Sequence, residues 1–129
     1  MTDRTRALYA DLATALGVAP FVPDDNGGIQ LTIGEDTNVA LYAEGDRDIL
    51  LIAPLAPLPA EPEYGIMLWL LRKNLYTSGL APFVVACDDG GTLVLWGRMP
   101  LDGLTGARLA SLVDAVAAEA RRIQAEVSP

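Results

Sequence analysis

Six consecutive apolar residues, Ile66 to Leu71, lie inside a segment that otherwise reads as a helix from about Glu63 to Tyr76. Successive helical residues are rotated by about 100°, so these side chains point in all directions and cannot share one face. The segment is too short to span a bilayer, so protein must cover it on both sides. The chain's own sheet can cover one flank, and a second copy of the chain is the simplest cover for the other. We therefore expect an obligate homodimer built around this helix.

The residues of this helix divide between two faces. Side chains three or four positions apart lie on the same side of a helix, which separates an inward set from an outward set. The set expected to pack on the sheet comprises Ile66, Met67, Leu70 and Leu71. The set expected to contact the second subunit comprises Leu68, Trp69, Arg72 and Tyr76.

The charge balance limits the possible partners. The chain has 129 residues, a length that fits one domain spanning residues 1–129. Its 17 acidic and 9 basic side chains give a net charge of −8. Such a surface repels phosphate backbones and anionic lipid headgroups. We therefore expect neither nucleic acid nor a membrane as a partner.

Cysteine usage and the N-terminal residues indicate the compartment. Cys87 is the only cysteine, so no intrachain disulfide can form, which is typical of a protein from a reducing cytosol. The apolar stretch Ala7–Ala10 is interrupted by Asp11 before it reaches the length of a signal-peptide core. The expected location is therefore cytoplasmic.

Hydrophobic periodicity predicts three helices and five strands. The helices are expected at about Thr2–Leu16, Glu63–Tyr76 and Thr105–Glu126. The strands are expected at residues 29–33, 39–43, 49–53, 82–87 and 92–98. Their order, helix-strand-strand-strand-helix-strand-strand-helix, predicts an α+β fold in which three helices pack against an antiparallel sheet.

Three segments refine this arrangement. Residues 49–53 are continuously apolar, which predicts a strand that is covered on both faces. Prolines at positions 54, 57, 59 and 62 predict an extended crossover that is neither helix nor central strand. The alternative for these prolines is a polyproline segment that docks into an aromatic groove. Residues 88–91, with two aspartates and two glycines, predict a hairpin turn between the last two strands.

The sequence lacks the usual residue sets of an active site. It contains no histidine, the commonest general base and metal ligand, and its three serines have no obvious partner base. Cys87 ends an apolar strand, which favours a structural thiol over a reactive one. The acidic turns at 24–26 and 88–89 lack the alternating spacing of a calcium loop, so solvated turns are favoured over a metal site. We expect no enzyme activity, cofactor, metal or small-molecule substrate.

The N-terminal third supplies more apolar side chains than one small core obviously needs. They lie on the first helix, in the loop after it and on the first strand, and the set expected to bind a partner comprises Tyr9, Ala13, Leu16, Phe21, Ile29, Leu31 and Ile33. One interpretation is that these residues close the core at its N-terminal end. The other is an open groove beside an unpaired strand edge, which would accept an extended segment of another protein.

Several stretches together resemble a known family. They are Leu70-Leu-Arg-Lys-Asn-Leu75, the hairpin from Pro82 to Trp96, the segment Met99-Pro-Leu-Asp-Gly-Leu104 and the amphipathic helix that follows. In these stretches, and in size, acidity and element order, the chain resembles the class I type III secretion chaperones, the Tir chaperone (CesT-like) family. The resemblance extends over nearly the whole chain.

This resemblance implies a function. It implies a cytosolic homodimer that binds the N-terminal chaperone-binding segment of a secreted effector and keeps that segment non-globular and secretion-competent, without a cofactor. It also implies a dimer contact on the second helix and effector grooves along the first helix and the neighbouring sheet. The alternative is a regulatory protein of the same fold that sequesters a transcriptional regulator or an anti-activator of the secretion genes. A small enzyme is the third hypothesis.

Overall fold

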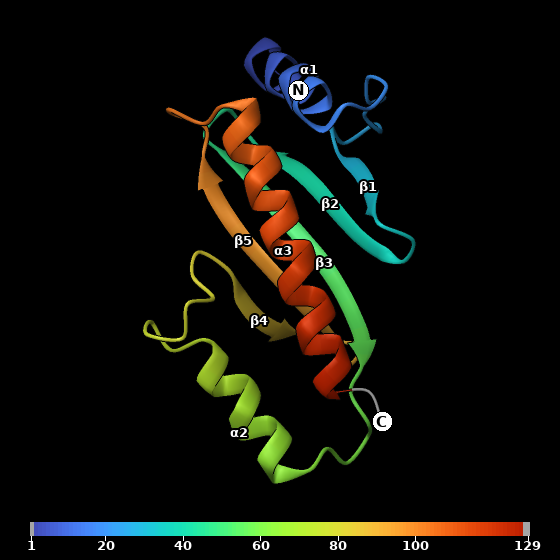
Figure 1. Cartoon of the computed structure of the whole chain (residues 1–129), viewed down its shortest axis with the longest axis vertical. Helices are drawn as coiled ribbons and strands as arrows, with labels where there is room; N and C mark the ends of the chain where they lie inside the picture. Colours follow the sequence, from blue (N-terminus) through green and yellow to red (C-terminus); the bar gives the residue numbers. More distant parts are fainter. Residues whose placement is uncertain (1, 128–129) are drawn as a thin grey trace.

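The structure, a computed structural model, describes residues 2–127 as three helices and five strands (Figure 1). The helices are α1 (Asp3–Leu16), α2 (Tyr64–Lys73) and α3 (Gly106–Val127). The strands are β1 (Ile29–Ile33), β2 (Thr37–Glu44), β3 (Asp48–Pro57), β4 (Val84–Cys87) and β5 (Thr92–Pro100). This confirms the predicted α+β fold and the order of its elements. The prediction that Pro54 and Pro57 lie outside the sheet is wrong, because β3 continues to Pro57. The pairing of β3 with β2 extends only to Ile52, so these two prolines lie where β3 is paired on one side only, a position that tolerates proline.

All five strands form one antiparallel sheet in the order β1-β2-β3-β5-β4. The hairpin predicted between the last two strands is present, and the Asp88 carboxylate accepts hydrogen bonds from the backbone N–H groups of Gly90 and Thr92 within its turn. Because β5 pairs with β3 and β4 pairs only with β5, the sheet ends at β1 on one side and at β4 on the other.

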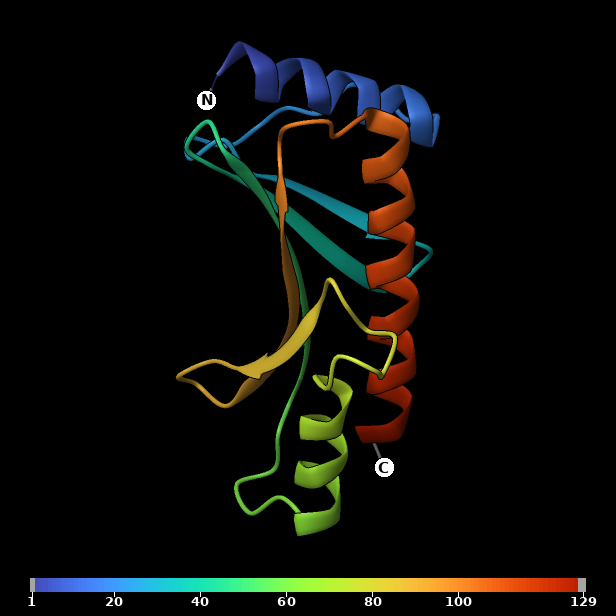
Figure 2. The ribbon, with the colours of Figure 1, turned by 90° about the vertical axis from the view of Figure 1, so that its left-hand side faces the viewer.

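Helix α3 covers one face of the sheet along its length (Figure 2). Its apolar stripe, which includes Leu109, Val113 and Ile123, is completely buried. The strands present alternate residues to this stripe, and Leu41 and Leu51 have no exposed surface. This shared core fixes the sheet register, because a shift by one residue would turn the apolar set away from α3.

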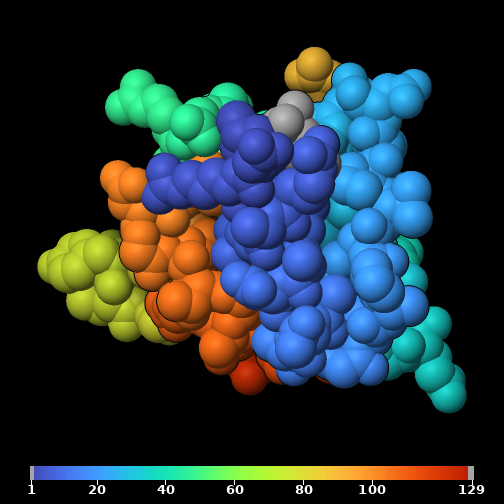
Figure 3. Space-filling model, turned by 90° about the horizontal axis from the view of Figure 1, so that it is seen from above, coloured from blue at the N-terminus to red at the C-terminus, as the bar shows by residue number. Residues whose placement is uncertain are grey.

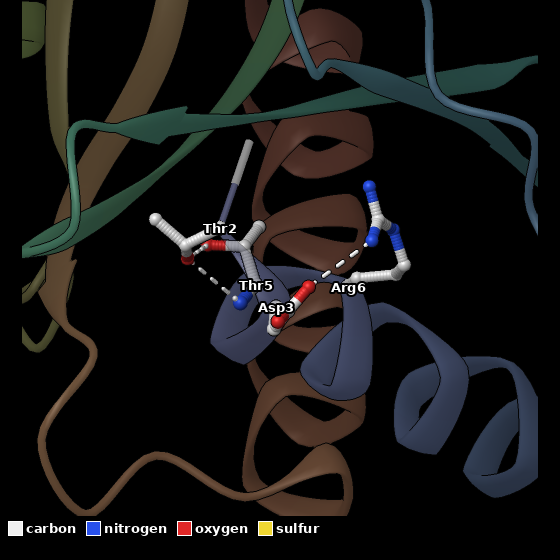
Figure 4. Close-up of polar contacts among 4 residues, drawn as sticks. All are labelled: Thr2, Asp3, Thr5 and Arg6. Carbon is white, nitrogen blue, oxygen red and sulfur yellow. Dashed lines mark hydrogen bonds and ion pairs between the residues drawn. The ribbon is translucent and has the colours of Figure 1, made fainter.

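The start of α1 is fixed by a local cap (Figure 4). The Thr2 side chain accepts a hydrogen bond from the Thr5 backbone N–H at 3.2 Å, which satisfies one of the helix's unpaired donors. The Arg6 guanidinium reaches the Asp3 carboxylate at 3.2 Å on the exposed side of the same turn. At the other end, Gly17 adopts a positive φ of 70°, which only glycine takes readily, and the helix stops there.

The prediction that residues 49–53 are covered on both faces is wrong for the single chain. Ile49, Leu51 and Ala53 are fully buried under α3, whereas Leu50 and Ile52 on the other face are only half-buried. The reason is that, among the described residues, no helix lies along this second face (Figure 2). We call it the open face, and its apolar side chains are Tyr42, Leu50, Ile52, Val94 and Trp96.

Helix α2 is shorter than predicted and turned differently. It lies beside β4 at the edge of the sheet, so only a narrow stripe of it is covered. Leu70 is buried and Trp69 packs partly against the core. Met67 and Leu71, predicted to pack on the sheet, border a groove beside β4 but remain 39% and 65% exposed, so the predicted packing is wrong for these two residues.

Close packing between α1 and α3 gives a stability prediction. A Cβ atom on Gly106 would lie 2.6 Å from the backbone carbon of Asp11, so Gly106→Ala should lower the free energy of unfolding by about 1 to 3 kcal/mol. Gly65→Ala is the matched control, because no atom lies within 4 Å of its Cβ position. Urea unfolding of the two variants measures the difference, and equal stability would contradict the close approach.

Candidate functional site

The outer edge of β1 is one of the two unpaired edges of the sheet. The strand pairs with β2 on one side, from Ile29 opposite Leu41 to Ile33 opposite Thr37. Within residues 2–127 no further strand lies on its other side, which faces outward in Figure 1. An unpaired strand edge of this kind presents N–H and C=O groups that another extended chain can pair with.

A groove of about 410 Å³ runs beside this edge. The residues that follow α1 form one wall and β1 forms the other, and the segment after α1 lies against the helix in Figure 3. We call it the β1 groove, and its lining residues are Leu16, Val18, Ala19, Phe21, Gln30, Leu31, Thr32, Ile33 and Gly34. The lining is mainly apolar, which suits the apolar side chains of an extended segment.

Four of the seven residues predicted to bind a partner meet in this groove. They are Leu16, Phe21, Leu31 and Ile33, three of them half-buried and Leu31 8% exposed. They come from the end of α1, the following loop and β1, so only the fold brings them together.

The other three predicted residues belong to the core. Tyr9, Ala13 and Ile29 are each 3% exposed, in keeping with the alternative that they close the core. The Tyr9 hydroxyl donates a hydrogen bond to the Gly27 carbonyl oxygen at 3.0 Å and so holds the loop in front of β1. These residues support the groove from below and do not line it.

Sequence reasoning missed the polar part of the lining. Gln30 and Thr32 alternate with the buried residues of β1, and the period of two was the signal that could have placed them on the exposed side of the strand. Gly34 has a φ of 70° in the turn after β1, where the Arg121 guanidinium lies close to it. Arg121 donates hydrogen bonds to the Ile33 carbonyl oxygen at 2.9 Å and to the Thr37 hydroxyl at 3.0 Å, and so ties α3 to the β1–β2 turn.

A second apolar surface lies between α2 and β4. A groove of about 170 Å³ there is bordered by Met67 and Leu71 on the helix and by Val85 and Cys87 on the strand. Large exposed apolar side chains continue along and beyond the same helix, and they include Tyr64, Leu75 and Tyr76.

The residues predicted for the subunit contact are distributed unevenly on this surface. Arg72 and Tyr76 are exposed and Leu68 is half-buried. Trp69 packs partly against the core, and the Lys73 ammonium lies 4.8 Å from the centre of its ring. The Trp69 side chain is therefore partly occupied by contacts within its own chain.

Residues 2–127 offer neither a metal-binding cluster nor a membrane-spanning helix. They contain no group of three or more Cys, Asp or Glu side chains placed to hold a metal ion. None of the described helices is long and apolar enough to cross a membrane.

A family model and a known relative match most of the chain. A family model described as the Tir chaperone protein (CesT) family matches residues 7–124. The chaperone protein YscB of Yersinia enterocolitica serotype O:8 is 36% identical over 103 residues, which cover 75% of this chain and 72% of YscB.

Solved structures have the same fold. A chain of the heterodimeric ExoU–SpcU complex from the type III secretion system of Pseudomonas aeruginosa aligns with a TM-score of 0.79 at 24% identity, over 95% of this chain and 98% of that one. A chain from the Yersinia pestis type III secretion chaperone SycH in complex with a stable fragment of YscM2 aligns with a TM-score of 0.78 at 21% identity, over 92% and 98%.

The buried phenol of Tyr9, behind the groove, predicts how the free energy of unfolding depends on pH. Burial, and to a lesser degree the Asp24 carboxylate, raise the pKa of Tyr9 from 10.0 to about 12. The folded state therefore favours the neutral phenol, so its contribution to the free energy of unfolding is complete below pH 10 and is lost as the pH rises from 10 towards 12. Tyr9→Phe should lower stability by about 1 kcal/mol at neutral pH, because a hydrogen bond is lost, and should flatten the alkaline decline. Urea unfolding at several pH values tests this, and parallel declines in the two proteins would contradict it.

Proposed function

Because the chain belongs to the Tir chaperone protein (CesT) family of type III secretion chaperones, we propose that it binds the N-terminal segment of a secreted effector in the β1 groove. The effector segment is held extended and non-globular, in a form that the secretion apparatus can accept. The observation that carries this proposal is the apolar groove beside an unpaired strand edge.

Binding combines strand addition with the filling of apolar pockets. The five residues of β1 offer a pairing length of about 17 Å to an extended client. Ordering a flexible segment costs roughly 2 to 5 kcal/mol, whereas each buried Leu or Ile side chain returns about 1.5 to 3 kcal/mol. A few apolar anchors over Leu16, Phe21 and Ile33 therefore suffice for tight binding without nucleotide hydrolysis.

The proposed role is binding and not catalysis, and it requires no cofactor. The chain acts in the bacterial cytoplasm as one domain of residues 1–129. A regulatory partner would use the same groove, so the identity of the bound protein separates the two functions. An exported protein indicates an effector chaperone, whereas a transcriptional regulator or an anti-activator indicates a regulatory role. No feature of the groove favours the regulatory alternative.

We also propose that the chain forms a homodimer through α2. Met67 and Leu71 border the groove between α2 and β4, and together with Tyr76 they leave apolar surface exposed to water. A second copy that presents the same surface would remove it from water, as a two-fold interface requires. The β1 groove lies on the opposite edge strand of the sheet from β4 and α2, so a dimer through α2 leaves it accessible.

The client groove is tested by a matched pair of neighbouring substitutions. Phe21 lines the groove, whereas Val22 is 92% exposed and does not line it. Phe21→Asp should reduce the amount of client that copurifies from the native host by at least about tenfold, because a charge would be buried beneath the client, while Val22→Asp should leave the amount unchanged. Mass spectrometry identifies and quantifies the client. Equal recovery with both variants would show that the client binds at a different surface.

The dimer contact is tested by Leu71→Glu. Leu71 is 65% exposed, so the folded monomer tolerates the change, but two carboxylates brought into one apolar interface would weaken the dimer. Light scattering after size exclusion should give the mass of one chain for Leu71→Glu and of two chains for the unaltered protein and for Val22→Glu. A Leu71→Glu protein that keeps the dimer mass would refute the placement on α2.

A further inference from the structure

The two edges of the sheet differ in whether one side chain bonds to both backbone groups of a residue in the edge strand. On β4, the side chain of Asn74 bonds to the backbone of Val85 twice. The Val85 N–H donates to the Asn74 Oδ1 atom at 2.7 Å, and the Asn74 Nδ2 group donates to the Val85 carbonyl oxygen at 2.9 Å. On β1, no side chain of the described residues makes such a pair.

This pair of bonds imitates a neighbouring strand. A carboxamide carries the same donor and acceptor as a peptide group, so it can occupy the position of one residue of an added strand. Strand β4 has four residues, and in an antiparallel strand alternate residues direct their backbone groups outward. Val85 is one of the two central residues of this short strand, so Asn74 occupies the middle of the edge that an added strand would need.

The backbone holds Asn74 in this position. It is the C-cap residue of α2, and its own N–H donates to the Leu71 carbonyl oxygen at 3.1 Å. The next turn is stabilised separately, because the Ser78 hydroxyl donates to the Lys73 carbonyl oxygen. The end of α2 therefore delivers the amide to the edge of β4, whereas the Ser78 hydroxyl bonds to the backbone of Lys73 and Leu80.

We propose that Asn74 closes the β4 edge against the addition of a further strand. Natural sheets protect exposed edges against pairing with other chains, and here a single side-chain amide provides the protection. The strand that would occupy an opened edge is β4 of a second copy, because antiparallel pairing about a two-fold axis brings identical edges together. This inference concerns the β4 edge alone and holds whether or not β1 binds a client.

The test compares Asn74→Ala with Asn74→Asp in the full chain. The alanine removes both bonds and leaves a neutral open edge. The aspartate keeps an acceptor for the Val85 N–H, and its charge still opposes pairing. Asn74→Ala should accelerate hydrogen exchange of the Val85 amide by about tenfold and give a mass by light scattering that rises with protein concentration above that of the unaltered protein. Asn74→Asp and the control Ser78→Ala should not show this rise in mass.

Each other outcome overturns the proposal. If Asn74→Ala keeps the mass of the unaltered protein, the amide does not guard the edge. If Asn74→Asp or Ser78→Ala also associates, the cause is a weakened helix end and not an open strand. Should Asn74→Ala fail to fold, exchange in the unaltered protein decides instead. The Val85 amide must then be clearly better protected than the outward amides of β1, and equal exchange at the two edges would refute the proposal.

Discussion

The sheet has a helix on one face only and ends in two edge strands, and the proposed contacts depend on this constraint. Helix α3 buries the apolar residues of one face, whereas α1 lies at one end of the sheet and α2 lies beside the edge strand β4. Backbone groups on a strand edge must be paired or hydrated, and apolar groups on an uncovered face remain partly in water. The isolated chain therefore leaves three surfaces incompletely covered: the β1 edge, the open face and the outward side of α2.

Recognition through a strand edge suits a protein that must hold an unfolded client. Backbone pairing depends little on the client's sequence, while the pockets beside it select for apolar side chains at alternate positions. The polar groups of Gln30 and Thr32 lie in the same groove, so the lining is not uniformly apolar. Tyr9 bonds to the loop before β1, and Arg121 bonds to the end of β1. These bonds hold both ends of the strand in place, so the groove is formed before a client binds.

The sequence predicted the elements well because their signals are local. Alternation marks β1, paired aspartates and glycines mark the β4–β5 turn, and helical spacing marks α3. Burial depends on which element lies opposite, and the sequence carries no local signal for it. Residues 49–53 are apolar throughout, yet only alternate members meet α3. The exposure of Met67 and Leu71 has the same origin, because the sequence could not place α2 at the edge of the sheet. Nor could it distinguish Tyr9, which supports the groove, from Leu16, which lines it.

The central claim is that the outer edge of β1 receives an extended client. Hydrogen exchange of the chain with and without its copurified client, resolved to single amides, tests this claim most directly. We expect the amides of β1 that face away from β2 to become strongly protected when the client is bound. Protection confined to the open face or to β4, with the β1 amides exchanging as in the free chain, would contradict it.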